Sequence, residues 1–126
     1  MAKVLIVDDD ADIVEAIQLV LEKEGFETAL AYNRPEGMKQ VEDAKPDLII
    51  LDVMMDEPDD GIAMAQELRR GQFDNPILML TSVAKVTGMK FGRDDEMVPV
   101  DEFVEKPIDP ATLVSKVKEL LSKGGA

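Results

Sequence analysis

The sequence predicts a doubly wound α/β domain, in which a parallel sheet carries helices on both faces. Short runs of consecutive aliphatic residues recur along the chain without alternating with polar residues, which is typical of strands buried on both faces. Helical patterns separate these runs, so strand and helix alternate over the whole length and indicate right-handed parallel crossovers. The length of 126 residues fits one domain.

The first elements follow one another closely. Lys3–Val7 is an almost purely apolar strand, and Ala11–Glu24 has the apolar spacing of a helix. Asp10 can cap the start of that helix and Gly25 can end it. Phe26–Ala31 is a weaker strand candidate.

The middle of the chain repeats this order. Arg34–Ala44 is predicted to be a helix and Asp47–Leu51 an apolar strand. Ile62–Arg70 is predicted to be a helix that follows Gly61, and Ile77–Leu80 is predicted to be another apolar strand. The three apolar runs are expected to form the centre of the sheet.

The last third contains one stretch that departs from the pattern. A helix is expected within Val83–Asp101, but the glycines, the proline and the charged cluster there support one or two turns, so we expect an atypical, irregular segment. Glu102–Glu105 is a weak edge-strand candidate, and Ala111–Ser122 is the final helix. Asp109 is its expected N-cap, and Pro110 takes the first helical position.

The helical patterns also predict which side chains face the core. These are Ile13, Ile17, Val20, Leu21, Met38, Val41, Ala65, Leu68, Leu113, Val117, Leu120 and Leu121. We expect one domain over residues 1–123 and a flexible tail over residues 124–126.

The composition excludes several kinds of chemistry. With 27 acidic and 14 basic residues, the net charge is −13, which argues against nucleic-acid and anionic-membrane surfaces. There is no cysteine or histidine, so thiolate nucleophiles, thiolate zinc sites and histidine bases are absent. Without a signal peptide or a membrane-spanning run, a cytoplasmic protein is expected.

The residues at the predicted strand ends form a coherent set. Asp8 and Asp9 follow the first strand, Asp52 follows the third, Thr81 the fourth and Lys106 the fifth. In open α/β sheets, ligands bind at the carboxyl ends of the strands. The three carboxylates would repel one another, and a bound Mg²⁺ would relieve that repulsion.

This set suits phosphoryl transfer. Asp52 is the natural nucleophile, since a carboxylate can accept a phosphoryl group and form an acyl phosphate. Mg²⁺, the Lys106 ammonium and the Thr81 hydroxyl or nearby backbone N–H groups could each stabilise one phosphoryl oxygen.

At this point the chain resembles the receiver domain of two-component response regulators, over roughly residues 3–122. The matching motifs are LIVDDD (Leu5–Asp10), DLIILDVMM (Asp47–Met55), ILMLTS (Ile77–Ser82) and FVEKP (Phe103–Pro107). The resemblance implies a five-stranded sheet of flavodoxin-like order 2-1-3-4-5. It also implies Asp52 as phosphoacceptor and a Mg²⁺ site formed by Asp8, Asp9, Asp52 and the backbone carbonyl of Met54.

The resemblance further implies that Lys106 contacts the phosphoryl group and that Thr81 and Phe103 form a conformational switch. The phosphodonor would be a histidine kinase or a phosphotransfer protein, and the output would be docking to an unknown protein partner. Because the chain ends where a receiver should, we expect a stand-alone module. It would catalyse only its own phosphorylation and dephosphorylation.

Two alternatives stay open. A Mg²⁺-dependent phosphatase with an aspartyl nucleophile would usually carry an acid two residues after that nucleophile, where this chain has Met54. A receiver-like module that binds partners without phosphorylation is the other alternative. One departure from the family pattern is an apparent one-residue insertion in Asp56–Gly61.

Overall fold

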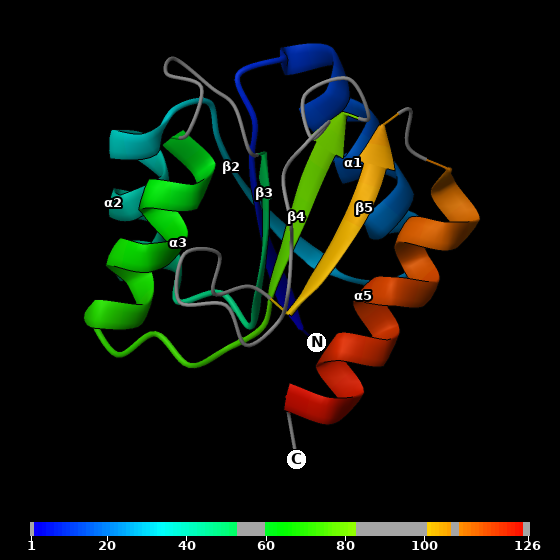
Figure 1. Ribbon diagram of the computed structural model, residues 1–126. Helices are drawn as coiled ribbons and strands as arrows, with labels where there is room; N and C mark the ends of the chain where they lie inside the picture. The colour runs from blue at the N-terminus through cyan, green and yellow to red at the C-terminus, as the bar shows by residue number, and fades with distance from the viewer. Residues whose placement is uncertain (1, 53–59, 83–100, 107–108, 125–126) are drawn as a thin grey trace.

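The computed structural model describes residues 2–52, 60–82, 101–106 and 109–124 (Figure 1). The described strands form one five-stranded parallel sheet in the order β2-β1-β3-β4-β5. They are β1 (Lys3–Val7), β2 (Glu27–Ala31), β3 (Leu48–Asp52), β4 (Ile77–Ser82) and β5 (Glu102–Lys106). The predicted doubly wound architecture and strand order are therefore confirmed.

Four described helices connect and flank these strands. They are α1 (Ala11–Lys23), α2 (Arg34–Ala44), α3 (Asp60–Arg70) and α5 (Pro110–Gly124). Figure 1 shows α2 and α3 on one face of the sheet and α1 and α5 on the other. No helix within these ranges has the length and apolar character that a membrane crossing requires.

The strand boundaries differ from the predicted ones mainly at the carboxyl ends. β3 begins one residue later than predicted and includes Asp52, and β4 continues to Ser82. β5 continues to Lys106. These polar residues still pair with the neighbouring strands. Asp52, Thr81 and Lys106 therefore belong to the carboxyl-terminal ends of the strands themselves.

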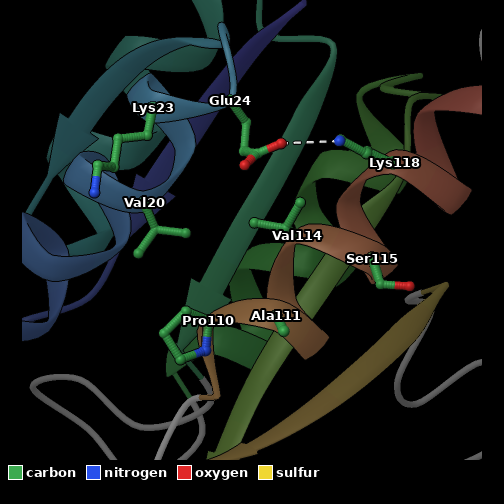
Figure 2. A pocket seen from close by; sticks show the side chains of 8 residues that line it. All are labelled: Val20, Lys23, Glu24, Pro110, Ala111, Val114, Ser115 and Lys118. Atoms are coloured by element: carbon green, nitrogen blue, oxygen red, sulfur yellow. Dashed lines mark hydrogen bonds and ion pairs between the residues drawn. The ribbon is translucent and has the colours of Figure 1, made fainter.

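The α1 and α5 helices lie side by side on their face of the sheet (Figure 2). Lys118 Nζ on α5 lies 2.9 Å from Glu24 Oε1 at the end of α1. A second ion pair joins Lys116 on α5 to Glu102 on β5 at 3.3 Å. A groove between the helices is lined by residues that include Val20 and Val114 (Figure 2).

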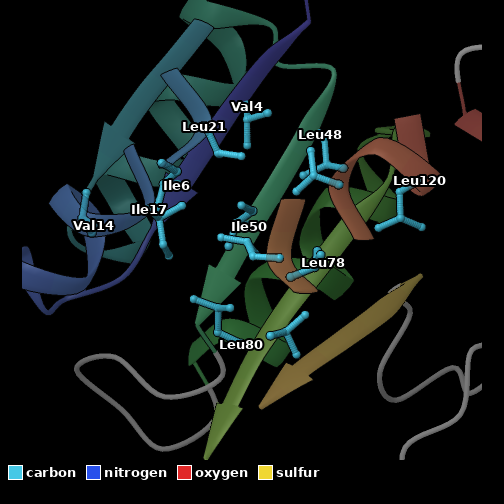
Figure 3. Close-up of a cluster of buried hydrophobic side chains, with 13 residues drawn as sticks. Val4, Ile6, Val14, Ile17, Leu21, Leu48, Ile50, Leu78, Leu80 and Leu120 are labelled. Atoms are coloured by element: carbon cyan, nitrogen blue, oxygen red, sulfur yellow. The ribbon is translucent and has the colours of Figure 1, made fainter. Parts of the chain in front are cut away.

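The core consists of two clusters, one on each face of the sheet. The cluster under α1 and α5 joins alternate strand residues to the inner faces of those helices (Figure 3). The cluster under α2 and α3 contains the other strand residues with Met64, Ala65 and Leu68. Each fully buried Leu or Ile stabilises the fold by about 1.5–3 kcal/mol, so these two layers carry most of the stability.

The predicted inner faces are confirmed for most helices. Leu113, Val117 and Leu120 are buried, and Leu121 packs partly against the same cluster. The prediction for α1 needs one correction, since its fully buried residues are Val14, Ile17 and Leu21, whereas Ile13 and Val20 are only half-buried. Val20 instead lines the groove between α1 and α5.

Both ends of α1 form as the sequence predicts. The Asp10 carboxylate accepts hydrogen bonds from the backbone N–H groups of Asp12 and Ile13. At the other end Gly25 has φ 91°, and the Phe26 N–H donates to the Leu21 carbonyl at 3.1 Å. This Schellman arrangement needs a left-handed residue, which glycine adopts without steric cost.

Three predictions concern segments that lie largely outside the described ranges. The irregular stretch within Val83–Asp101 is described only at Asp101, and the insertion in Asp56–Gly61 only at its last two residues, with which α3 begins. The α5 helix extends to Gly124, one residue into the predicted tail, and residues 125–126 are not described.

Candidate functional site

The candidate site lies where β1 and β3 end side by side. The two strands pair in parallel with Val7 opposite Leu51, so Asp8 and Asp52 follow at adjacent positions. The chain leaves β1 toward β2 on one side, while β3 lies on the other side. This reversal of strand order is the topological switch point, at which open α/β sheets form their binding crevice.

Three carboxylates meet at this switch point. Asp8, Asp9 and Asp52 each offer one oxygen, and these three atoms all lie within 4.8 Å of one another. Asp8 is fully buried and Asp52 is 3% exposed, whereas Asp9 is exposed to solvent. The sequence-based prediction that these residues come together is confirmed by the geometry.

The loop after β1 holds these carboxylates in place. The Asp8 N–H donates to the Ala31 carbonyl at 3.2 Å, which continues the pairing of β1 with β2 by one residue. The Asp8 Oδ1 atom in turn accepts the Asp10 N–H at 2.9 Å. Asp10 itself caps α1, so the acidic triplet divides into two carboxylates of the cluster and one structural cap.

The cluster fits a hard divalent cation. All three ligand groups are carboxylates, which Mg²⁺ and Ca²⁺ prefer over nitrogen or sulfur ligands. Two negative charges about 5 Å apart repel by roughly 3 kcal/mol at an effective dielectric constant of 20. A cation among Asp8, Asp9 and Asp52 would replace this repulsion with attraction.

The other predicted site residues are placed by the backbone or lie outside the description. Thr81 lies near the end of β4, opposite Glu105, and Lys106 ends β5 opposite Ser82. Both therefore lie at the carboxyl-terminal ends of their strands, as Asp52 does. Phe103 lies inside β5 opposite Met79. Met54 falls in residues 53–59, outside the described ranges, so its role and those of the side chains above stay predictions.

The amino-terminal ends of the strands, opposite the site, hold polar contacts that the sequence did not predict. The Asp101 carboxylate accepts the Ile77 N–H at 2.9 Å and pairs with the Arg69 guanidinium at 2.8 Å. The same guanidinium donates to the carbonyls of Phe73 and Asn75. The only sequence signal was the position of an aspartate directly before a predicted strand.

Comparison with known proteins identifies the family that this fold and site define. A parallel five-stranded sheet with an acidic cluster at its switch point is an arrangement in which open α/β proteins bind ligands. Residues 4–118 match the response regulator receiver domain family, and the chain belongs to this family.

The relatives agree with this assignment. The chain is 38% identical over 125 residues to the alkaline phosphatase synthesis transcriptional regulatory protein PhoP of Bacillus subtilis, covering 96% of this chain and 49% of that protein. It is also 38% identical over 128 residues to the phosphate regulon transcriptional regulatory protein PhoB of Pseudomonas aeruginosa, covering 97% of this chain and 52% of that protein. The chain thus spans about half the length of these two relatives.

A solved structure has the same fold. The crystal structure of a two-component response regulator from Clostridium difficile superposes with a TM-score of 0.82 and 26% identity, and the match covers 100% of both chains. The family and the fold therefore rest on both sequence and structure.

Proposed function

We propose that this receiver accepts a phosphoryl group on Asp52 in a Mg²⁺-dependent reaction and signals by docking to another protein. The observation that carries the proposal is the cluster of Asp8, Asp9 and Asp52 oxygens within 4.8 Å at the carboxyl ends of β1 and β3. Asp52 ends a central strand whose other residues are fully buried, so the backbone holds its carboxylate in one place.

The chemistry follows from these residues. An Asp52 carboxylate oxygen attacks the phosphorus and forms a new P–O bond, while the bond to the donor breaks and the donor atom keeps the electron pair. Asp8, Asp9 and the Met54 carbonyl would help to hold Mg²⁺ beside this oxygen. The metal supplies positive charge that offsets the charge on the phosphoryl oxygens.

Two further residues complete the proposed site. The Lys106 ammonium would stabilise a phosphoryl oxygen from the end of β5. The Thr81 hydroxyl would contact another oxygen and, with Phe103, would shift a two-state equilibrium when Asp52 is phosphorylated. The backbone positions of Thr81 and Lys106 near the carboxyl ends of β4 and β5 support their part of this assignment.

The proposed partners follow from the family. The phosphodonor is a histidine kinase or a phosphotransfer protein, which supplies the histidine that this chain lacks. PhoP and PhoB are transcriptional regulatory proteins and about twice as long. For this chain we propose a cytoplasmic location. We also propose output through protein contacts, because a net charge of −13 disfavours nucleic acid and anionic membranes.

Intact-mass measurement after incubation with acetyl phosphate and Mg²⁺ tests the proposal. The parent chain should gain one phosphoryl group, and Asp52→Asn should gain none, because an amide oxygen is a far weaker nucleophile than a carboxylate. No gain in the parent would leave a receiver that binds partners without phosphorylation, and an equal gain in both would contradict Asp52 as the phosphoacceptor. Sustained turnover of phosphomonoesters would instead support a phosphatase.

A further inference from the structure

At the amino-terminal ends of the strands, opposite the site, two hydrogen bonds join β1 to the residue before β3. The Lys3 N–H donates to the Asp47 Oδ2 atom at 2.8 Å, and the Asp47 N–H donates to the Lys3 carbonyl at 2.8 Å. One aspartate therefore binds both backbone groups of a single residue on the neighbouring strand. We call this contact the Asp47 clasp.

The same arrangement recurs between β4 and the residue before β5. The Ile77 N–H donates to the Asp101 Oδ2 atom at 2.9 Å, and the Asp101 N–H donates to the Ile77 carbonyl at 2.9 Å. Arg69 reinforces this second contact, the Asp101 clasp, with a charged hydrogen bond at 2.8 Å. Charge-assisted bonds of this kind are about twice as strong as neutral ones.

These two contacts specify the pairing register of the strands, which the apolar pattern alone does not. Four consecutive residues in each of β1, β3 and β4 are fully buried and aliphatic, so both faces of these strands are apolar. A one-residue slip turns every side chain of a strand to the other face of the sheet, and a register is specified most strongly where one face is buried. A one-residue slip in these strands would exchange one aliphatic residue for another, whereas it would break both bonds of a clasp.

The spacing links each clasp to the site. Asp8 lies five positions after Lys3, and Asp52 lies five positions after Asp47. In the same way Ser82 lies five positions after Ile77 and Lys106 five positions after Asp101, and Ser82 pairs with Lys106 across the two strands. Because a strand rises about 3.3 Å per residue, a slip at a clasp would move the site residue by that distance.

We propose that Asp47 and Asp101 are positioning residues for phosphoryl transfer. Asp47 sets the register that places Asp52 beside Asp8, and Asp101 sets the register that places Lys106 beside the end of β4. The inference rests on the proposed function, because it assigns Asp52 and Lys106 to that reaction. It predicts that the two clasps affect different steps.

Two alanine variants separate these steps. Asp47→Ala should weaken Mg²⁺ binding about tenfold in a calorimetric titration, the lower end of what lost outer support costs a metal site. Asp101→Ala should leave the Mg²⁺ dissociation constant within about twofold, because β5 carries no metal ligand. At saturating Mg²⁺ it should slow phosphorylation by acetyl phosphate about tenfold, as a displaced catalytic group does.

Conservative variants and a matched control sharpen the test. Asp47→Asn and Asp101→Asn keep an oxygen that accepts the backbone N–H, so they should recover most of the lost affinity or rate. Asp43→Ala removes an exposed aspartate from α2 and should change neither readout. If an alanine variant does not fold, Asp47→Glu and Asp101→Glu displace the carboxylate while keeping its charge, and the same split should appear with smaller amplitude.

Several outcomes would overturn the inference. One is an equal loss of Mg²⁺ affinity in the Asp47 and Asp101 variants, which would indicate a general loss of stability. Another is unchanged affinity and rate in both. If the parent chain accepts no phosphoryl group, the proposed function fails, but the Mg²⁺ titrations still decide whether the Asp47 clasp positions the metal site.

Discussion

Buried negative charge is the main residue-scale feature of this receiver. Asp8 and Asp52 are almost completely buried, with the exposed Asp9 carboxylate close to both. Removing a carboxylate from water is costly unless it is paired or hydrogen-bonded. The backbone bond from Asp10 to Asp8 offsets part of this cost, and a bound cation would offset more. The cluster therefore predicts that the folded state gains stability from Mg²⁺.

Thermal unfolding with and without Mg²⁺ checks this expectation. At about ten times the dissociation constant, a ligand stabilises the folded state by about 1.4 kcal/mol. For a domain of this size, that corresponds to a rise of about 4–6 °C in Tm. Asp9→Ala should abolish most of the rise.

The neighbouring Asp10 provides the control. Asp10→Asn keeps a side-chain oxygen that can cap α1, so it should retain the Mg²⁺-dependent rise in Tm. If Mg²⁺ at millimolar concentration leaves the parent Tm unchanged, the metal assignment is wrong.

Sequence alone could predict the three clustered carboxylates but not the clasps. Asp8 and Asp52 follow apolar runs, and the rule that sites form at the carboxyl ends of strands assigns them a role. Asp47 and Asp101 precede strands, and their contacts depend on which strand lies next to which and in what register. That information comes from the folded sheet.

At the scale of single elements, the helix ends show how far local sequence decides structure. Gly25 ends α1 in a left-handed conformation, as the sequence predicts. At the end of α3 the left-handed residue is Gln72, with φ 69°, although Gly71 lies directly before it. The Phe73 N–H donates to the Leu68 carbonyl at 3.0 Å in the same Schellman pattern. Phe73 packs partly against the core cluster under α2 and α3, the kind of hydrophobic contact that often accompanies this motif.

The N-terminus of α5 gives a pH-dependent prediction. Hydrogen bonds from the Thr112 hydroxyl at 2.7 Å and the Thr112 N–H at 3.1 Å lower the pKa of Asp109 below its ordinary value of 3.8. A lowered pKa in the folded state means that the ionised carboxylate stabilises the fold above pH 3.8. This contribution is lost as the pH falls through the lowered pKa.

Asp109→Ala should therefore lower Tm by about 2–5 °C at neutral pH, and the difference from the parent should shrink in acid. Melting curves between pH 7 and pH 3 measure both effects. Asp109→Ser keeps a capping oxygen without a titratable group, so its Tm should stay near that of the parent at pH 7. A difference for Asp109→Ala that does not depend on pH would contradict the assignment.

At the scale of the whole molecule, the two apolar layers outweigh the surface charges. Ion pairs such as Arg34–Glu67 and Lys118–Glu24 join neighbouring helices at 2.7 and 2.9 Å, but their side chains are partly exposed. Pairs of this kind contribute about 0–1 kcal/mol each. The layer architecture was predictable because the apolar runs are uninterrupted, whereas the packing distance between a helix and the sheet was not.

Gly37 shows where that distance is set. It is buried in α2, and a Cβ atom there would lie 2.7 Å from Met64 Cε and 3.3 Å from Val7 Cγ1. Gly37→Ala gains helix propensity of about 1 kcal/mol but overpacks the layer, at a cost of about 1–3 kcal/mol. We expect a net loss of about 1 kcal/mol in the free energy of unfolding, measured by urea titration.

A double variant separates the two effects. Met64→Val shortens the side chain that the new methyl group would meet, so Gly37→Ala should become neutral or stabilising in that background. The same loss in both backgrounds would show that close packing of α2 against Met64 is not the reason for glycine at this position.

The central claim is that Asp52 is the residue that accepts the phosphoryl group. Borohydride reduces an acyl phosphate to an alcohol, so reduction of the chain after treatment with acetyl phosphate and Mg²⁺ marks the modified aspartate, and peptide mass spectrometry locates it. We expect a reduced residue at position 52 and at no other aspartate. Reduction at Asp8 or Asp9, or no reduced residue in the parent chain, would contradict it.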